Sequence, residues 1–428
     1  MVVGLALSIA LHELGHFIPA KLFGVKVAQF MIGFGPTVFS RKRGETEFGL
    51  KAIPLGGYIS MSGMFPPKAP GGNSRTASTG FFQTLVQDAR SSSADTVSAG
   101  DEHRTFYRLP IYKRIIIMLG GPFMNLIIAL VLYAVVLCGF GVAQQSTTLG
   151  SVSACVLPAT SARQNCASGD AEAPGSRAGL KPGDRLVSIN GMRISSWNQA
   201  TAIIRVSAQK PLAMVVERSG KTVEVSATPS LTERYATDAT GVVTKSSDGT
   251  RITQKVGFLG IGAAVEVVQQ PITAVLPAVG DNIARVGELI THLPDRLVAV
   301  ANAAFGAGAR DPNGPISVVG VGRVAGEIAS INSIPITDRL SALIGILASL
   351  NVALLVFNLV PLLPLDGGHV AGALYEGVRR FFAKLFGRKD PGPVDTAKLI
   401  PLTLTVVMVL GAMSALLIYA DIVKPISF

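Results

Sequence analysis

The chain has 428 residues, of which 49% are hydrophobic and only 15% are charged. This balance excludes an ordinary soluble protein of this length and indicates a polytopic membrane protein. The formal net charge of +11 does not indicate nucleic-acid binding, because the basic residues gather beside apolar segments. Between the first two such segments there are 13 basic and 6 acidic residues, whereas region 143–339 has 18 and 15.

The first apolar segment, residues 1–23, is predicted to span the membrane. Up to position 20 its ionisable side chains are those of His12, Glu13 and His16. On a helix, His-Glu-x-x-His places two imidazoles on one face, where both can bind Zn²⁺, with the glutamate as general base. Chance is the alternative for so short a pattern, but ionisable residues inside a membrane are costly and suggest function. The segment lacks the basic start and the cleavage site of a signal peptide.

Residues 24–64 are predicted to form membrane-associated β-hairpins. Segment 46–53 partly alternates between apolar and polar residues, 54–58 has turn composition, and 59–62 alternates again. An ordinary surface hairpin is the alternative. Residues 65–110 are expected to be a flexible cytoplasmic loop, because most of this stretch is rich in small and polar residues.

Three further segments are long and apolar enough to span a bilayer, which takes about 20 residues. They are residues 111–142, 340–368 and 399–421. Basic residues near span ends mark the cytoplasmic side. The predicted fold is therefore a four-helix polytopic membrane protein, with region 143–339 and both termini outside the cytoplasm. The segment 369–398 is then a cytoplasmic loop.

Residues 147–228 are predicted to form a compact α+β domain. Strands are expected at 211–217 and 222–227, and a helix at 198–206. The run Gly-Leu-x-x-Gly-Asp-x-Leu-x-x-Ile-Asn-Gly, at 179–191, resembles PDZ domains, which bind peptide termini by adding a strand to a sheet edge. Cys155 and Cys166 lie on the predicted outer side, where a disulfide can persist. Two free thiols remain the alternative.

Region 229–339 is expected to be an extracytoplasmic linker with amphipathic helices. Residues 229–255 have the composition of a loop, 256–262 of a strand, and 272–305 of one or two amphipathic helices. These helices are expected either to lie on the membrane or to pack on the PDZ-like domain.

A catalytic zinc site has three protein ligands and an open position for water, so a third ligand is needed besides His12 and His16. Asp366 is the best candidate, because it follows the third apolar segment where prolines and glycines break the helix. His103 and His292 lie in a predicted loop and an outer helix, and His369 is interpreted as a structural neighbour. One zinc per chain is expected. Asn125 and Asn351 are polar residues within spans, for which bonding between helices is the ordinary interpretation.

These motifs resemble those of the site-2 proteases, specifically the RseP-type bacterial intramembrane proteases with a PDZ insertion. The family pattern is His-Glu-x-x-His in the first span and Asn-x-x-Pro-x-Pro-x-Leu-Asp-Gly in the third. The second pattern matches at Asn358, Pro361, Leu365, Asp366 and Gly367. The chain departs from the family at Leu363, with the proline moved to 364. Further matches are Gly33-Phe-Gly-Pro36, Pro54-Leu-Gly-Gly-Tyr58 and Gly121-Pro-x-x-Asn125, and the Cys pair is similar to that of actinobacterial members.

The resemblance implies a zinc metalloendopeptidase of the cell membrane that cuts the transmembrane segments of single-span proteins. Anti-sigma factors already trimmed outside, or signal-peptide remnants, are the implied substrates. It implies substrate contacts at Asn358 and Pro361, and at Gly57 and Tyr58 in the hairpin region, with the PDZ domain as a filter. Two competing hypotheses are a membrane-anchored PDZ receptor without chemistry and a zinc peptidase that digests soluble outer peptides.

Overall fold

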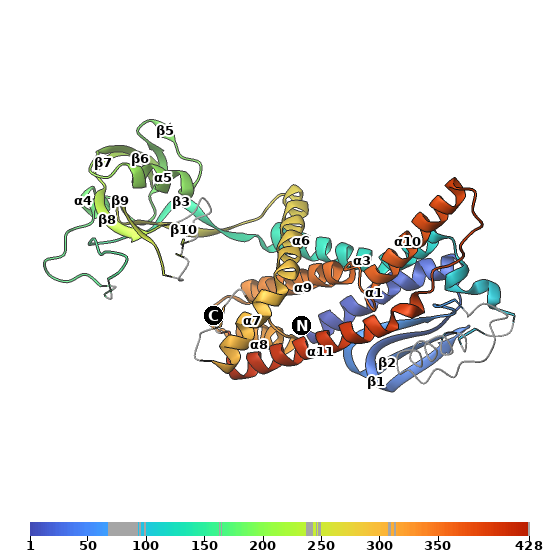
Figure 1. Ribbon diagram of the computed structural model, residues 1–428. Helices are drawn as coiled ribbons and strands as arrows, with labels where there is room; N and C mark the ends of the chain where they lie inside the picture. Colours follow the sequence, from blue (N-terminus) through green and yellow to red (C-terminus); the bar gives the residue numbers. More distant parts are fainter. Residues whose placement is uncertain are drawn as a thin grey trace. The chain divides into compact units, whose positions relative to one another are not determined.

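The computed structural model describes residues 1–66, 93, 96–97, 100–161, 163, 165–236, 243–244, 246, 250–306, 310–311 and 314–426. Most of the predicted loop at 65–110 lies outside these residues. The chain divides into two compact units, and each is considered by itself (Figure 1). Unit 1 comprises residues 1–140 and 271–428, and unit 2 comprises residues 141–270.

Among the described residues of unit 1, four helices are long and apolar enough to cross a membrane, and they coincide with the four predicted spans. They are α1 (Val2–Leu22), α3 (Ile111–Ala134), α9 (Ile336–Asn358) and α11 (Ile400–Val423). A wider helical turn extends α3 to Phe140. The third span ends ten residues before its predicted boundary at 368, because the chain leaves the helix after Asn358.

Helix α3 is central to unit 1, since it packs along α1 and also contacts α9 and α10 (Figure 1). Gly15 on α1 faces Gly120 on α3 so closely that a Cβ on either would lie 2.2 or 2.0 Å from the other's carbonyl oxygen. Small residues let membrane helices approach at backbone distance. This contact fixes the register between α1 and α3.

The predicted hairpin region forms two long strands beside α1, β1 (Val27–Arg43) and β2 (Thr46–Met61). Each strand changes its partner midway. Residues 29–32 pair with 57–60 and also with 47–50, while 37–43 pair with 46–51. The result is a curled sheet of four segments with 57–60 at one edge. The chain reverses near the turn predicted at 54–58, because residues 47–50 run in the same direction as 29–32 and residues 57–60 run in the opposite direction, although β2 is continuous through this stretch.

Glu45, in the turn between the two strands, ties the sheet to neighbouring elements. Its carboxylate accepts hydrogen bonds from both terminal nitrogens of Arg104, each at 2.8 Å, and from Lys21 of α1. The bonds from Arg104 and then Lys21 lower the pKa of Glu45 to about 2. The turn is thereby held by charge-assisted bonds, which are stronger than neutral ones.

Four other helices lie in the described part of unit 1. They are α6 (Val275–Thr291), α7 (Leu293–Phe305), α8 (Val318–Ser330) and α10 (Asp366–Leu385). The first two confirm the helices predicted within 272–305. They pack on spans of unit 1, with α6 against α9 and α3 and α7 against α11. Neither α8 nor α10 was predicted, and most of the segment 369–398, expected as a loop, is helix α10.

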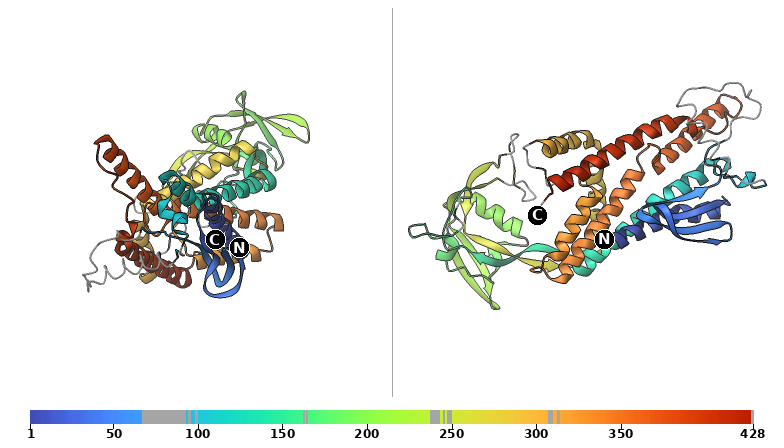
Figure 2. Two further views of the ribbon diagram at one scale, coloured as in Figure 1. Left: turned by 90° about the vertical axis from the view of Figure 1, so that its right-hand side faces the viewer. Right: turned by 90° about the horizontal axis from the view of Figure 1, so that it is seen from below.

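Unit 2 is a β-rich unit with one longer helix (Figure 2). Its main sheet has the strand order β10-β3-β4-β6-β7, with β5 paired to β4, and a second sheet pairs β8 with β9. The strands are β3 (Val142–Val152), β4 (Arg185–Ile189), β5 (Met192–Arg193), β6 (Leu212–Arg218), β7 (Lys221–Ala227), β8 (Ser230–Tyr235), β9 (Thr253–Phe258) and β10 (Ile261–Val268). The helices are α4 (Pro174–Arg177) and α5 (Trp197–Val206).

The predicted strands at 211–217 and 222–227 and the helix at 198–206 are confirmed by β6, β7 and α5. Two predictions were wrong. Residues 230–235 are strand β8 within the expected loop, and the expected strand at 256–262 is interrupted between β9 and β10.

The core of unit 2 lies between α5 and the main sheet, and Leu186, Ile189 and Val216 are almost fully buried there. Truncating such a side chain typically costs about 2–5 kcal/mol. The buried carboxylate of Asp184 is held by Arg218, whose Nε lies 2.7 Å from Oδ1, and this bond lowers the pKa of Asp184. Cys155 and Cys166 are joined by a disulfide.

Candidate metal centre

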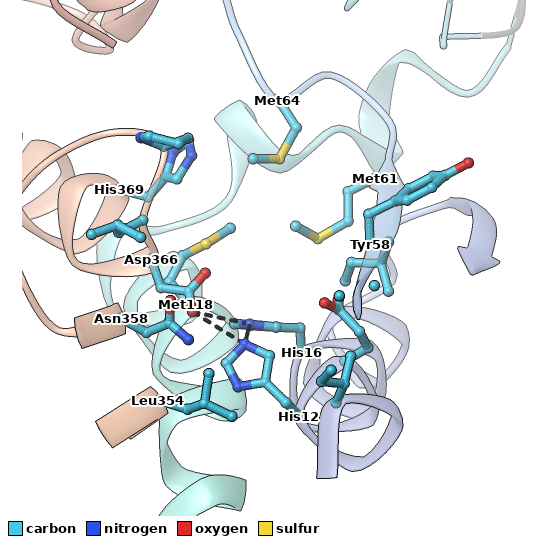
Figure 3. A pocket seen from close by; sticks show the side chains of 17 residues that line it. His12, His16, Tyr58, Met61, Met64, Met118, Leu354, Asn358, Asp366 and His369 are labelled. Atoms are coloured by element: carbon cyan, nitrogen blue, oxygen red, sulfur yellow. Dashed lines mark hydrogen bonds and ion pairs between the residues drawn. The ribbon is translucent and has the colours of Figure 1, made fainter. Parts of the chain in front are cut away.

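Helices α1 and α10 bring three side chains of metal-ligand type to one point (Figure 3). His12 and His16 lie one turn apart on α1, with their Nε2 atoms 3.2 Å apart. Oδ2 of Asp366, the first residue of α10, lies 3.5 Å from His12 Nε2 and 3.3 Å from His16 Nε2. Residues at least 350 positions apart in the sequence thus converge, as the two sequence motifs suggested.

The three side chains fit a divalent metal ion. Their ligand atoms all lie within 4.8 Å of one another. Asp366 Oδ2 is buried and has no hydrogen-bond partner, although it faces both imidazoles. A buried acceptor without a donor is costly, and a cation between the three groups would compensate it. Two imidazoles and one carboxylate suit zinc, with a fourth position left for water.

Asp366 is held in place by the break after α9. The chain turns from Asn358 to Asp366, and Gly367 and Gly368 pack against this turn. A Cβ on Gly367 would lie 2.4 Å from the carbonyl oxygens of Leu359 and Val360. Glycine is therefore required for the close approach. The Asp-Gly-Gly sequence both starts α10 and folds it against the turn.

Helix α3 forms the wall behind the imidazoles. His16 Nδ1 lies 2.7 Å from the carbonyl oxygen of Ile117, and His12 Nδ1 lies 3.0 Å from the side-chain amide of Asn125. Gly121 lies between these two contacts, where a Cβ would come within 2.2 Å of His16 Nε2 and 2.7 Å of His12 Nε2. The position leaves no room for a larger residue.

A cavity of about 400 Å³ opens beside the three side chains. Glu13, Gly57, Tyr58 and Asn358 line it, and a Cβ on Gly57 would lie 2.9 Å from Cγ of Glu13. Pro361 is not among its lining residues in the described part of the chain. His369 lines the cavity without belonging to the metal-ligand group.

Several residues that line this cavity were not predicted from the sequence. The thioethers of Met61, Met64 and Met118 lie around the cavity (Figure 3), and Leu354 lines it from α9. They come from three separate regions, and no local pattern marks them. His292 caps α6 through the carbonyl oxygen of Glu288 and is remote from the centre. His103 lies in a short helical turn at Glu102–Arg104.

Comparison with known proteins settles the family. Residues 1–389 match the model of Peptidase family M50. The chain belongs to this family. The match confirms the site-2 protease family that the motifs suggested.

Relatives cover almost the whole chain. It is 32% identical to "Zinc metalloprotease Rip1" of Mycobacterium tuberculosis, over 99% of this chain and 96% of that protein. It is 29% identical to "Metalloprotease MmpA" of Caulobacter vibrioides, over 88% of this chain and 85% of that protein. The M50 chain is accordingly a zinc metalloprotease, and its predicted cofactor is confirmed.

Proposed function

We propose that this M50 protease hydrolyses peptide bonds within the transmembrane segments of single-span membrane proteins. One observation carries the proposal. His12 and His16 lie on α1, a helix long and apolar enough to span a bilayer, and Asp366 meets them there. A peptidase for soluble peptides would be expected to hold its metal in an aqueous domain.

In this proposal His12, His16 and Asp366 hold one zinc ion, and Glu13 is the catalytic base. Bound zinc supplies a Lewis acid that lowers the pKa of a bound water toward about 7. Glu13 lines the same cavity and is 9% exposed. Its carboxylate accepts a proton from the attacking water and donates it to the nitrogen of the departing peptide.

We further propose that the substrate binds in an extended form along the sheet. A transmembrane helix hides its peptide bonds in internal hydrogen bonds, so it must unwind before cleavage. Segment 57–60 lies at the edge of the sheet among the described residues, and Gly57 and Tyr58 line the cavity. A free strand edge bonds an added strand through its backbone. Asn358 lines the cavity from the end of α9 and would bond the unwound substrate, with Pro361 shaping the turn behind it.

Unit 2 would act as a PDZ domain on the outer side of the cell membrane, opposite the basic segments at 24–110 and 369–398. A cavity of about 310 Å³ within unit 2 supports this role, since it lies between α5 and residues 256–261. Trp197, Thr201 and Ile204 line it from the helix. The proposed substrates are anti-sigma-factor-like proteins already trimmed outside, with signal-peptide remnants as a second class. In the proposed topology both termini would also lie outside.

The test compares membrane-protein fragments by mass spectrometry in cells with the wild-type chain and with Glu13→Gln. Fragments that begin or end inside transmembrane segments are expected with the wild-type chain alone. Purified Asp366→Ala should bind less than one tenth of an equivalent of zinc, and His292→Ala, a change at an exposed histidine, should keep about one equivalent. Identical fragment sets in both strains, or full zinc content in Asp366→Ala, would contradict the proposal.

A further inference from the structure

Helix α3 contacts both imidazoles of the metal centre from behind, at positions spaced by four residues. Ile117, Gly121 and Asn125 lie on one face of this helix. His16 Nδ1 meets the carbonyl oxygen of Ile117, and His12 Nδ1 meets the amide of Asn125, while both Nε2 atoms face Asp366. The two histidines thus have the same arrangement, with different partners on Nδ1.

A neutral imidazole that binds a metal through Nε2 carries its proton on Nδ1 and donates it to an acceptor. His16 has such an acceptor in the carbonyl oxygen of Ile117, at 2.7 Å. His12 needs one as well. The side chain at this place is that of Asn125, which is fully buried.

The amide of Asn125 can present either of its two ends to His12. In the structure Nδ2 lies 3.0 Å from His12 Nδ1, and Oδ1 is buried without a hydrogen-bond partner. Nδ2 donates only to an unprotonated Nδ1, and this tautomer puts the proton of His12 on Nε2, where a metal would bind. The oxygen and nitrogen ends of an amide have nearly the same shape, so the hydrogen-bond network decides between them. Metal binding requires the opposite end, with Oδ1 accepting from His12.

We propose that Asn125 is a positioning residue of the metal centre, whose Oδ1 accepts the Nδ1 proton of His12 and so directs Nε2 toward the ion. The inference rests on the proposed ligation by His12. Asn351 provides a contrast. It is equally buried in a span and its Oδ1 also has no hydrogen-bond partner, but its Nδ2 donates to Ser8 Oγ at 3.0 Å and to the carbonyl oxygen of Leu347 at 2.8 Å. Asn351 joins α9 to α1, whereas Asn125 contacts His12, a proposed metal ligand.

The experiment measures zinc affinity of the full purified chain by competition with a chromophoric chelator, without any substrate. Asn125→Leu keeps the side-chain volume and removes the acceptor, and should weaken zinc binding about 10–100-fold. Asn125→Asp keeps an acceptor at the same place and should stay within about threefold of the wild-type chain, since carboxylate-histidine-zinc arrangements are common. Asn351→Leu is the matched control, and its zinc affinity should not change.

Two further measurements separate orientation from folding. Thermal unfolding of the metal-free proteins should show that Asn125→Leu and Asn125→Asp are both folded. Visible absorption of the cobalt-substituted proteins should match between the wild-type chain and Asn125→Asp and differ in Asn125→Leu, because the spectrum reports ligand geometry. If Asn125→Leu does not fold, Asn125→Ala and Asn125→Asp are compared in the same way.

Unchanged zinc affinity in Asn125→Leu would overturn the inference. Equal loss in Asn125→Asp and Asn125→Leu would also overturn it, because an acceptor would then not be what the site needs. Both outcomes are distinct from a failure of the proposed function, which would appear as absent cleavage by a wild-type chain with its full zinc content.

Discussion

Arg114 on α3 and Glu376 on α10 form a buried ion pair, with Nη2 of the arginine 2.6 Å from Oε1 of the glutamate. The two residues connect the helix behind the imidazoles to the helix that begins with Asp366. Glu376 is 1% exposed, and it also pairs with Arg380 at 3.1 Å and accepts from the backbone of Val394. The pair therefore maintains the distance between the two halves of the metal centre.

Loss of either partner should destabilise unit 1, and Glu376→Ala should do so more than Arg114→Met. Glu376→Ala leaves buried Arg114 without a partner, which typically costs about 3–5 kcal/mol. After Arg114→Met, Glu376 keeps the bonds from Arg380 and Val394. Thermal unfolding in detergent measures both changes, with Lys389→Ala, a change at an exposed residue outside this ion-pair network, as control. If Arg114→Met lowers the thermal stability more than Glu376→Ala does, Arg380 and Val394 do not compensate the buried charge of Glu376.

Gly121→Ala should remove zinc from the protein. The added Cβ would lie 2.2 Å from His16 Nε2 and 2.7 Å from His12 Nε2, which no real contact allows. The imidazoles must then shift out of the metal position. Gly139→Ala is the control on the same span, since its Cβ meets nothing within 4 Å. Elemental analysis of both purified proteins decides the matter, and equal zinc content would refute the steric argument.

Glu13→Gln should keep the fold and the zinc ion but lose cleavage. An amide has nearly the same shape as the carboxylate but cannot take a proton from water and pass it on. Loss of such general-base catalysis typically costs about 10²–10⁴-fold in rate. Single-turnover cleavage of a reconstituted single-span substrate gives the rate, and zinc analysis is the control. Near-normal turnover would remove Glu13 from the mechanism.

The sequence predicted the parts of the centre that depend on local patterns. Apolar runs marked the four spans, and helical spacing put His12 and His16 on one face. The contact between Asn125 and His12 could not be predicted in this way. It depends on the register between α1 and α3, which the close approach of Gly15 and Gly120 fixes, and a single sequence does not show which glycines meet.

The sheet shows the same limit. Local composition at 54–58 indicates the reversal of the chain, but it does not show that residues 57–60 return to pair with 29–32 within the continuous strand β2. Helix α10 was missed because it follows the proline-rich break and carries many charges, so it has no continuous apolar run. In the sheet, pairing between distant segments decides where residues 57–60 lie, and local preference does not show this pairing.

Cys155 and Cys166 should be oxidised in protein extracted from membranes, as their disulfide in unit 2 requires. Oxidation also follows from the proposed outer location of this unit. Peptide mapping without reductant should recover the two cysteine peptides as one linked species, and Cys138 in the second span serves as the unpaired control. Alkylation of both thiols in freshly extracted protein would contradict the bond and the proposed side of the membrane together.

Removal of unit 2 should relax substrate selection and leave the chemistry intact. The proposed ligands and base all lie in unit 1. In the proposed function, unit 2 acts as a filter against substrates with bulky outer parts. Gln145 pairs with Val265, and the strands continue in pairs to Val142 and Val268. Residues 146–264 can therefore be replaced by a two-residue Asn-Gly turn that closes a short hairpin.

The shortened chain should cut both a full-length and a pre-trimmed substrate, whereas the complete chain should cut only the trimmed one. Cleavage of both substrates by the shortened chain and by the complete chain is measured in the same vesicles. The shortened chain with Glu13→Gln is the inactive control. Zinc content and thermal unfolding establish that the shortened chain is folded. If it holds zinc and is folded but cuts neither substrate, unit 2 takes a direct part in binding and the filter hypothesis is wrong.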